Sequence, residues 1–250
     1  MLFLPSSTLA SRLTLALACA CAVASCGGGD PADFDPVLDR AEGIWAGTSS
    51  TGFDVSVAIL ENGETWGVYT SGETIVGAIH AETRSSDGRL GGHGREFNIP
   101  NRSVAGFSYT GTYVPRSAIT ATTSNFVELT GTYQPAYLER AFLSEIAGNY
   151  TASAVTGTSP VQSITATISA DGAVTVPPSL GCSAAGFVRP RASRRNVFDV
   201  VVTFSGASCA LGNGATVTGV AYYDRATRRA IVMGLNPAQT DGFIAVGTKQ

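Results

Sequence analysis

Short runs in which apolar and polar residues alternate cover most of the chain after residue 43. The run 54–59 has its apolar residues at every second position, and the Asn-Gly pair at 62–63 that follows is typical of a type I′ hairpin turn. The same arrangement returns at 164–168, followed by an Asp-Gly pair at 171–172. Alternation with a period of two predicts β-strands that have one face buried.

Further runs of this kind recur along the chain and are separated by turn residues, which predicts a β-sandwich or β-barrel. The composition agrees, because glycine is frequent and lysine occurs only at Lys249. We therefore expect an all-β fold. The further strands are expected at 65–69, 75–82, 94–99, 105–113, 118–123, 127–133, 198–204, 215–223, 230–235 and 242–247.

Two internal sequence repeats indicate how the strands are organised. The sequence Thr-Gly-Thr-Tyr at 110–113 returns at 130–133, a shift that suits neighbouring strands of a meander. Gly-Ile-Trp at 43 and Gly-Asn-Tyr at 148 each open a half that continues into an Asn-Gly or Asp-Gly hairpin, which indicates a duplicated β unit. We predict two tandem antiparallel β-barrel or sandwich units, at 43–136 and 148–250.

The connector at 137–147 is the one segment with helical spacing. Leu138, Phe142, Glu145 and Ile146 recur at intervals of three and four. This spacing predicts that a short helix over 137–146 joins the two β units.

The first 25 residues contain one charge, Arg12, and then an apolar and small stretch too short to cross a bilayer comfortably as a helix. The stretch ends in Val-Ala-Ser-Cys at 23–26, which resembles the lipobox of bacterial lipoprotein signal peptides. The resemblance implies removal of residues 1–25 and acylation of Cys26, with palmitate among the chains. Gly27 after the cysteine favours anchoring in the outer membrane of a Gram-negative cell. The alternative is ordinary secretion with Cys26 as a spare thiol.

After Cys26 the chain is rich in glycine, proline and aspartate, so residues 26–42 are predicted to be a flexible acidic tether. Of the five cysteines, two leave with the signal peptide and Cys26 carries lipid, which leaves Cys182 and Cys209. An exported chain is expected to oxidise such a pair, so we predict a disulfide between them. The alternative is two buried thiols.

Candidate catalytic and metal-binding residues are few, because the chain has two histidines. His80 and Glu82 share one face of a predicted strand, but two ligands do not make a metal site, so we expect a solvated or hydrogen-bonded histidine. His93 lies in a Gly-Gly-His-Gly run that lacks the lysine and the helix of a phosphate-binding loop, and we expect a flexible hairpin there. We predict neither a metal nor a cofactor.

The sequence has no Gly-x-Ser-x-Gly motif, and neither histidine has a recognisable partner at a motif spacing. A pair of carboxylates for glycoside cleavage stays open, although the acids mostly lie beside turn residues. We therefore predict a protein that is not an enzyme. A net charge of −3 and an envelope address argue against a nucleic-acid partner.

Two arginine-rich segments, 189–195 and 225–229, make the C-terminal half positive, with eight bases against five acids from residue 141 onward. Guanidinium groups bind phosphate and carboxylate, so these loops could hold an anionic glycan or an acidic protein. The alternative is that arginine-rich turns keep an exposed edge soluble.

Gly43-x-Trp45 resembles the opening motif of lipocalins, in which the tryptophan plugs the base of the barrel. More broadly, the chain resembles bacterial envelope lipoproteins with tandem small lipocalin-like barrels. We predict an outer-membrane-anchored binding or interaction module, the alternative being a lipocalin-like carrier of a small apolar ligand. The aromatic residues that could line its cavity, or instead fill a core, are Trp45, Trp66, Tyr69, Phe107, Tyr109, Tyr113, Tyr133, Tyr222 and Tyr223.

Overall fold

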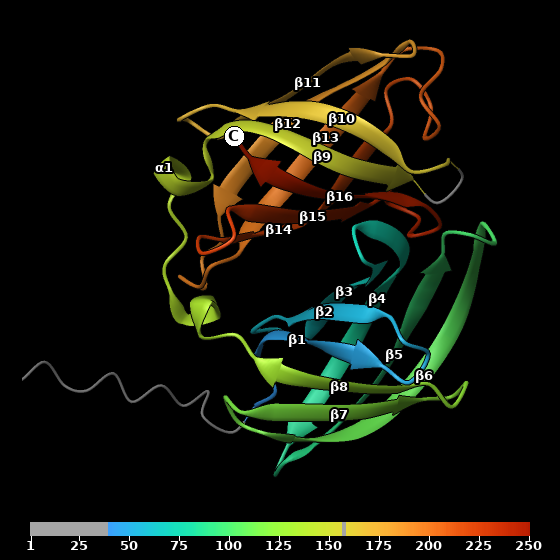
Figure 1. Cartoon of the computed structure of the whole chain (residues 1–250), viewed down its shortest axis with the longest axis vertical. Helices are drawn as coiled ribbons and strands as arrows, with labels where there is room; N and C mark the ends of the chain where they lie inside the picture. The colour runs from blue at the N-terminus through green and yellow to red at the C-terminus, as the bar shows by residue number, and fades with distance from the viewer. Residues whose placement is uncertain (1–39, 157–158) are drawn as a thin grey trace, which may run out of the picture. The chain divides into compact units, whose positions relative to one another are not determined.

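The computed structural model describes residues 40–156 and 159–250, which belong to one compact unit of the chain. These residues form two closed antiparallel barrels of eight strands each, and in each barrel the first strand pairs with the last (Figure 1). The all-β prediction is confirmed, and both units are barrels rather than sandwiches.

The strands of the first barrel follow one another as a meander, as the repeated Thr-Gly-Thr-Tyr sequence predicted. They are β1 (Gly43–Ser49), β2 (Asp54–Ile59), β3 (Glu64–Ser71), β4 (Thr74–Ser86), β5 (Arg89–Asn98), β6 (Ser103–Val114), β7 (Ala118–Thr123) and β8 (Glu128–Tyr133).

The second barrel repeats this order of strands. It contains β9 (Gly148–Thr156), β10 (Gln162–Ile168), β11 (Ala173–Ser179), β12 (Cys182–Pro190), β13 (Phe198–Ser205), β14 (Thr216–Asp224), β15 (Arg229–Leu235) and β16 (Gly242–Lys249).

Equivalent turns in the two barrels carry the same hydrogen bonds. Gly63 ends the β2–β3 turn and Gly172 ends the β10–β11 turn, with φ values of 86° and 88°. The carbonyl of Gly63 accepts from the backbone N–H of Thr83 at 2.7 Å, and that of Gly172 accepts from Val188 at 2.8 Å. These matches support the predicted duplication. The turn type differs from the prediction, because a type I′ turn needs positive φ at Asn62 as well, and only the glycine has it.

The first strand of each barrel begins with an aromatic side chain that donates a hydrogen bond to a preceding backbone carbonyl. The indole N–H of Trp45 donates to the carbonyl of Ala41 at 2.9 Å, and the hydroxyl of Tyr150 donates to the carbonyl of Ile146 at 2.5 Å. Each aromatic residue therefore bonds to the residue four positions before it. Both side chains are buried near the point where the first strand begins.

The predicted connecting helix is wrong in extent. The connector contains a 3-10 turn, η2 (Pro135–Leu138), and a single α-helical turn, α1 (Leu143–Ile146), separated by extended residues. A continuous helix would bury Leu138, Phe142 and Ile146 on one side. Leu138 and Phe142 are instead 37% and 45% exposed, and only Ile146 is buried. Tyr137 is buried in one core cluster and Ile146 in another, so the two ends of the connector are packed in separate places.

His93 lies in the middle of β5 and not in the flexible hairpin expected from its glycine neighbours. The turn into β5 is made by Asp87 and Gly88, which have φ values of 51° and 72°. Gly92 is required by a close approach rather than by flexibility, because a Cβ there would lie 2.6 Å from the hydroxyl oxygen of Tyr109.

Candidate functional site

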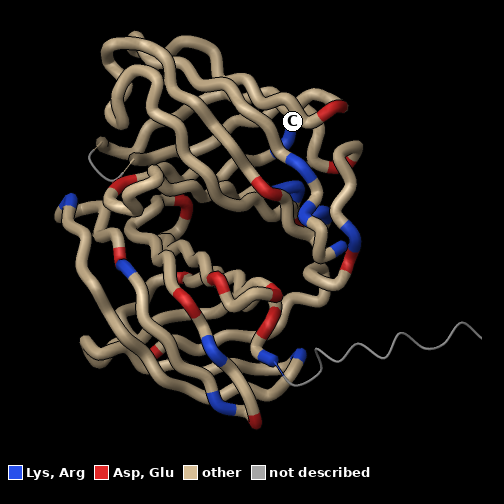
Figure 2. The backbone as a smooth tube through the Cα atoms, turned by 180° about the vertical axis from the view of Figure 1, so that it is seen from behind, with Lys and Arg blue, Asp and Glu red and all other residues tan. Residues whose placement is uncertain are grey.

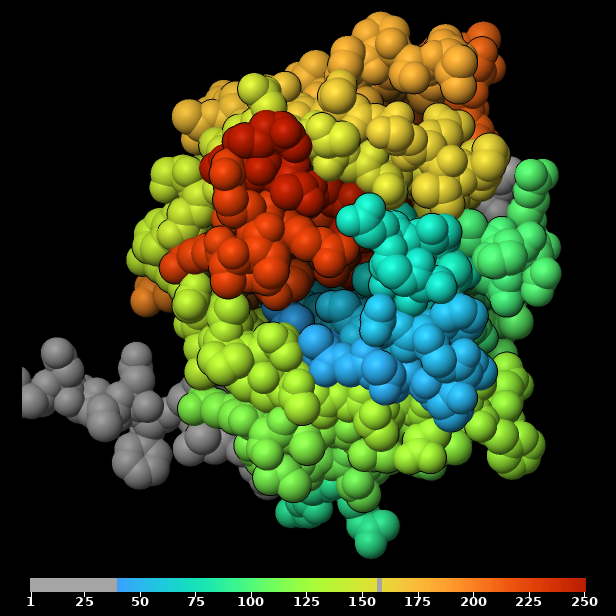
Figure 3. All heavy atoms as spheres, viewed as in Figure 1, coloured from blue at the N-terminus to red at the C-terminus, as the bar shows by residue number. Residues whose placement is uncertain are grey.

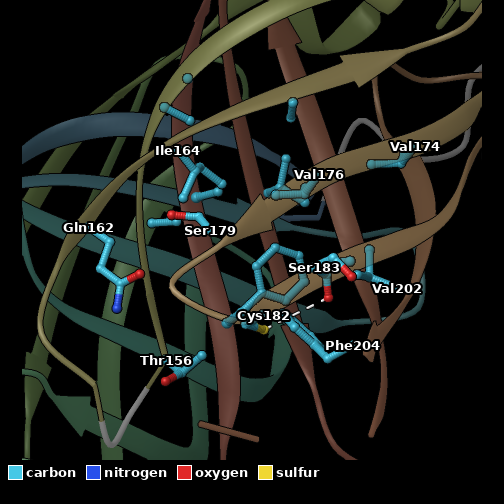
Figure 4. A pocket seen from close by; sticks show the side chains of 18 of the residues that line it. Thr156, Gln162, Ile164, Val174, Val176, Ser179, Cys182, Ser183, Val202 and Phe204 are labelled. Atoms are coloured by element: carbon cyan, nitrogen blue, oxygen red, sulfur yellow. Dashed lines mark hydrogen bonds between the residues drawn. The ribbon is translucent and has the colours of Figure 1, made fainter. Parts of the chain in front are cut away.

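The second barrel encloses an apolar cavity of about 190 Å³. Ile164 and Val176 lie close together on the neighbouring strands β10 and β11 of the cavity wall, with Thr156 and Cys182 toward its loop end (Figure 4). An apolar cavity of about 150 Å³ is large enough to stay dry and bind benzene. The space stays open because many of the side chains in its wall are small. They include Ala152, Ala154, Ala166, Ala184, Ala230 and Ala245.

The first barrel, by contrast, is nearly filled. Its interior leaves a cavity of about 50 Å³, and Trp45, Phe107 and Tyr109 are among the side chains that occupy the barrel. The Tyr109 hydroxyl forms a hydrogen bond with Thr83, whose hydroxyl in turn bonds with Thr65, each at 2.5 Å. Burial raises the pKa of Tyr109, so this polar chain stays neutral within an otherwise packed core.

Strand register explains the difference between the barrels. From the equivalent residues Thr83 and Val188, two steps across the sheet lead to Tyr109 in the first barrel and to Gly219 in the second. The phenol that fills the first barrel therefore has no counterpart in the second. A Cβ at Gly219 would lie 2.1 Å from the carbonyl oxygen of Met233, so the strands leave no room for a side chain at this position.

We call the end of the second barrel where β9 begins its closed end. Ile146 of α1 is fully buried in the same cluster as Tyr150, which lines the cavity. Burial raises the pKa of the Tyr150 phenol well above its usual value, so this end of the cavity presents a neutral surface.

The opposite, open end is formed by the loops β9–β10, β11–β12 and β13–β14. Residues that line the cavity here are also exposed, and Leu180, which is 81% exposed, lies at the tip of the β11–β12 turn. Leu180 and Gly181 both have positive φ, at 49° and 82°, which is the geometry of a type I′ turn. On the face seen in Figure 3, β9, β10 and β16 form a continuous outer surface.

The predicted disulfide joins Cys182 and Cys209 at this open end. Cys182 begins β12 and lines the cavity, and Cys209 lies in the β13–β14 loop. The bond therefore ties the longest loop of the open end to the barrel wall.

All but one of the charged residues of the second barrel lie toward its closed end. Of the five acids and eight bases from residue 141 onward, Asp241 alone lies in an open-end connection, the β15–β16 turn. Figure 2 shows basic and acidic positions interspersed near the C-terminus, while much of the barrel wall carries neither.

The nine aromatic residues that the sequence offered as a possible cavity lining do not line the cavity of the second barrel. Trp45, Phe107 and Tyr109 face the interior of the first barrel, and none of the nine residues contributes to the wall of the larger cavity. Its aromatic lining consists of Tyr150, Phe204 and Phe243. The alternation in 198–204 and 242–247 could have indicated the last two, because it predicts which side chains face inward.

His80 is a hydrogen-bonded strand histidine, as expected. Its Nε2 lies 3.3 Å from Oε1 of Glu64, and its ring packs against Trp66 with centroids 4.3 Å apart. The hydrogen bond from His80 lowers the pKa of Glu64. Among the residues that the structure describes, no three His, Cys, Asp or Glu side chains gather as metal ligands.

Several arginines of the two arginine-rich segments are paired within the chain. A carboxylate from an external partner would have to compete with these internal carboxylates, and binding of an anionic glycan or protein stays a prediction. The ion pairs are those of Arg191 with Glu61 and Asp199, Arg195 with Glu42, and Arg225 with Glu139 and Glu145.

The predicted signal peptide, the acylated Cys26 and the tether up to residue 39 lie outside the described residues. Within 40–156 and 159–250, no helix is long and apolar enough to cross a membrane.

No family model and no curated protein matches this sequence. Among solved structures, the chain is similar to a single-residue mutant of the vaccine antigen transferrin binding protein B from Haemophilus parasuis Hp5. The two share 7% identity with a TM-score of 0.29, and the match covers 78% of this chain and 65% of that one. At this level the similarity carries no argument about function.

Proposed function

We propose that this protein is a lipid-anchored, non-enzymatic binding protein of the cell envelope, and that its second barrel holds a small apolar molecule. The observation that carries the proposal is the apolar cavity of about 190 Å³, beside a first barrel of the same topology that is filled. Of the two functions expected from the sequence, this contrast favours the carrier.

The size of the cavity sets the scale of affinity. Burial of about six methylene groups at about 0.8 kcal/mol each contributes about 5 kcal/mol before the cost of immobilising the ligand. This gain alone corresponds to a dissociation constant of about 0.2 mM, so after the immobilisation cost a molecule of this size should bind in the millimolar range.

Toluene tests the proposal, because it is uncharged and about as large as one aromatic ring. Saturating toluene should raise the thermal unfolding temperature of the wild-type protein, since a ligand that binds only the folded state stabilises it. Val202→Phe should abolish this rise, because Val202 is buried and lines the cavity. Isothermal titration calorimetry gives the affinity directly.

Val201→Phe is the matched control, because Val201 directly precedes Val202 in β13, lies outside the cavity lining and is 43% exposed. This variant should keep the toluene effect. If Val202→Phe proves unfolded by circular dichroism, Ala245→Leu, on β16, fills the same space with a smaller change. Unchanged toluene binding in a folded cavity-filling variant would contradict the proposal.

The anchor is tested separately in cells of a Gram-negative host. Cys26→Ser should abolish labelling by radioactive palmitate and move the protein from the membrane fraction to the soluble fraction, because several acyl chains are needed for stable anchoring. Cys19→Ser, within the predicted signal peptide, should leave labelling intact. Labelled Cys26→Ser protein would remove the lipid anchor from the proposal.

A further inference from the structure

The open end of the second barrel is built almost entirely from uncharged residues. The β9–β10, β11–β12 and β13–β14 connections contain no Asp, Glu, Lys or Arg in their sequences. Asp241, in the fourth connection, accepts a hydrogen bond from the backbone N–H of Gly242 through its side chain. The cavity wall likewise contains no charged side chain.

Polar but neutral groups surround the cavity at this end. The hydroxyls of Thr156, Ser179 and Ser208 and the carboxamide of Gln162 belong to its lining. Hydroxyl and carboxamide groups both donate and accept hydrogen bonds, so they can pair with a neutral polar group of a ligand in either role.

We propose that the ligand is an uncharged amphiphile, with an apolar body in the cavity and a neutral hydrogen-bonding head, such as a hydroxyl, at the open end. This inference rests on the proposed function and names the chemical class of its ligand. The orientation follows from the lining, since the closed end offers only the neutral Tyr150 phenol among apolar side chains.

The arrangement of charges argues against a carboxylate or phosphate head. A charged group that leaves water needs a counter-charge, and the arginines of this barrel lie at its closed end. Arg189 lies seven positions after Cys182 in β12, a span of about 23 Å, which exceeds the screening length of about 8 Å at physiological salt. Two charged residues reach the β15–β16 connection, Asp241 and Arg95 of the first barrel, which donates to the carbonyl of Gln239 at 2.8 Å, and neither belongs to the cavity lining.

Calorimetric titration of octan-1-ol, octanoate and toluene into the wild-type protein at pH 8 tests this assignment. Octan-1-ol should bind about ten-fold or more tightly than octanoate, because both contain eight carbons and the main difference between their heads is the charge. Lowering the pH through the carboxyl pKa of octanoate should bring its affinity toward that of octan-1-ol, whose own affinity should stay constant. Octanoate binding as tightly as octan-1-ol at pH 8 would overturn the proposal.

Gln162→Lys places a positive charge at the open end on an exposed side chain. This variant should raise octanoate affinity at pH 8 several-fold and leave octan-1-ol unchanged, with Thr165→Lys on the outer face of β10 as the matched control. If octanoate binds the Gln162→Lys variant as weakly as the wild type, the polar head of the ligand does not lie at the open end, and the proposed orientation is wrong. If toluene binds and octan-1-ol binds no more tightly than octanoate, the ligand class is wrong and the proposed function stands. If none of the three compounds binds the wild-type protein, both proposals are wrong.

Discussion

Trp45→Ala should lower the free energy of unfolding by about 3–5 kcal/mol, the usual range when a large buried aromatic side chain is truncated. Trp45 is 2% exposed, lines the interior of the first barrel and packs edge-on against Tyr133 with ring centroids 5.3 Å apart. The truncation removes these contacts and also the indole hydrogen bond to the carbonyl of Ala41. Urea unfolding followed by circular dichroism measures the loss.

Phe126→Ala is the matched control in the same barrel, because Phe126 is 88% exposed. Its free energy of unfolding should stay within about 0.5 kcal/mol of the wild type. Equal small losses in the two variants would show that Trp45 does not hold the first barrel together.

Removal of the disulfide should lower the free energy of unfolding by roughly 3.5 kcal/mol. In the chain-entropy model, this is the expected loss for a cross-link whose cysteines are separated by 27 residues in sequence. The variant combines Cys182→Ala with Cys209→Ala, and urea unfolding is again the measurement. Because the bond ties the β13–β14 loop to β12, toluene affinity should fall as well.

The double variant is compared with a Cys26→Ser parent and is made in that background. In the mature form of this parent, Cys182 and Cys209 are the remaining cysteines. A reducing agent should destabilise the parent and have no effect on the double variant. A loss below 1 kcal/mol in the double variant would mean that the folded barrel, rather than the cross-link, determines the position of the loop.

The alternation of apolar residues predicts most of the strands, but not β1 and β9, which only the Gly-x-aromatic motifs mark, nor β11 and β12. Pro177 and Pro178 lie at the end of β11, where the register with β12 shifts between Val176 and Ser179. Prolines remove backbone donors, so a run that contains two of them does not have the pattern of a strand. The barrel accommodates the two prolines at this register shift between β11 and β12, and the shift cannot be predicted from the sequence of β11 alone.

The cavity could not be predicted, because it depends on which residues meet across strands. Tyr109 and Gly219 occupy equivalent positions, but their equivalence follows from two successive registers and not from spacing along the chain. The large aromatic residues that sequence reasoning selected as cavity lining include those that fill the first barrel. A hollow barrel is instead marked by alanine at inward positions, a signal that alternation alone does not separate from an ordinary core.

The disulfide and the opening aromatic residues were more accessible to sequence reasoning. Cys182 and Cys209 were expected to pair because the other cysteines are removed or acylated in the predicted mature protein. The Gly-x-aromatic echo at Trp45 and Tyr150 corresponds to the same hydrogen bond in both barrels. Such local features do not depend on register, whereas the contents of the barrel do.

Closure of both sheets has a consequence for molecules that stand close together. In each barrel the first strand is hydrogen-bonded to the last, so neither described sheet ends in an outer strand. The ladder between β10 and β11 is short, since it joins only Thr167 to Thr175 and Ile168 to Val174. Apart from this short ladder, a second copy or an unfolded chain finds little template on which to add a strand. A protein made almost wholly of β-structure can in this way be crowded on a surface with little tendency to form fibrils.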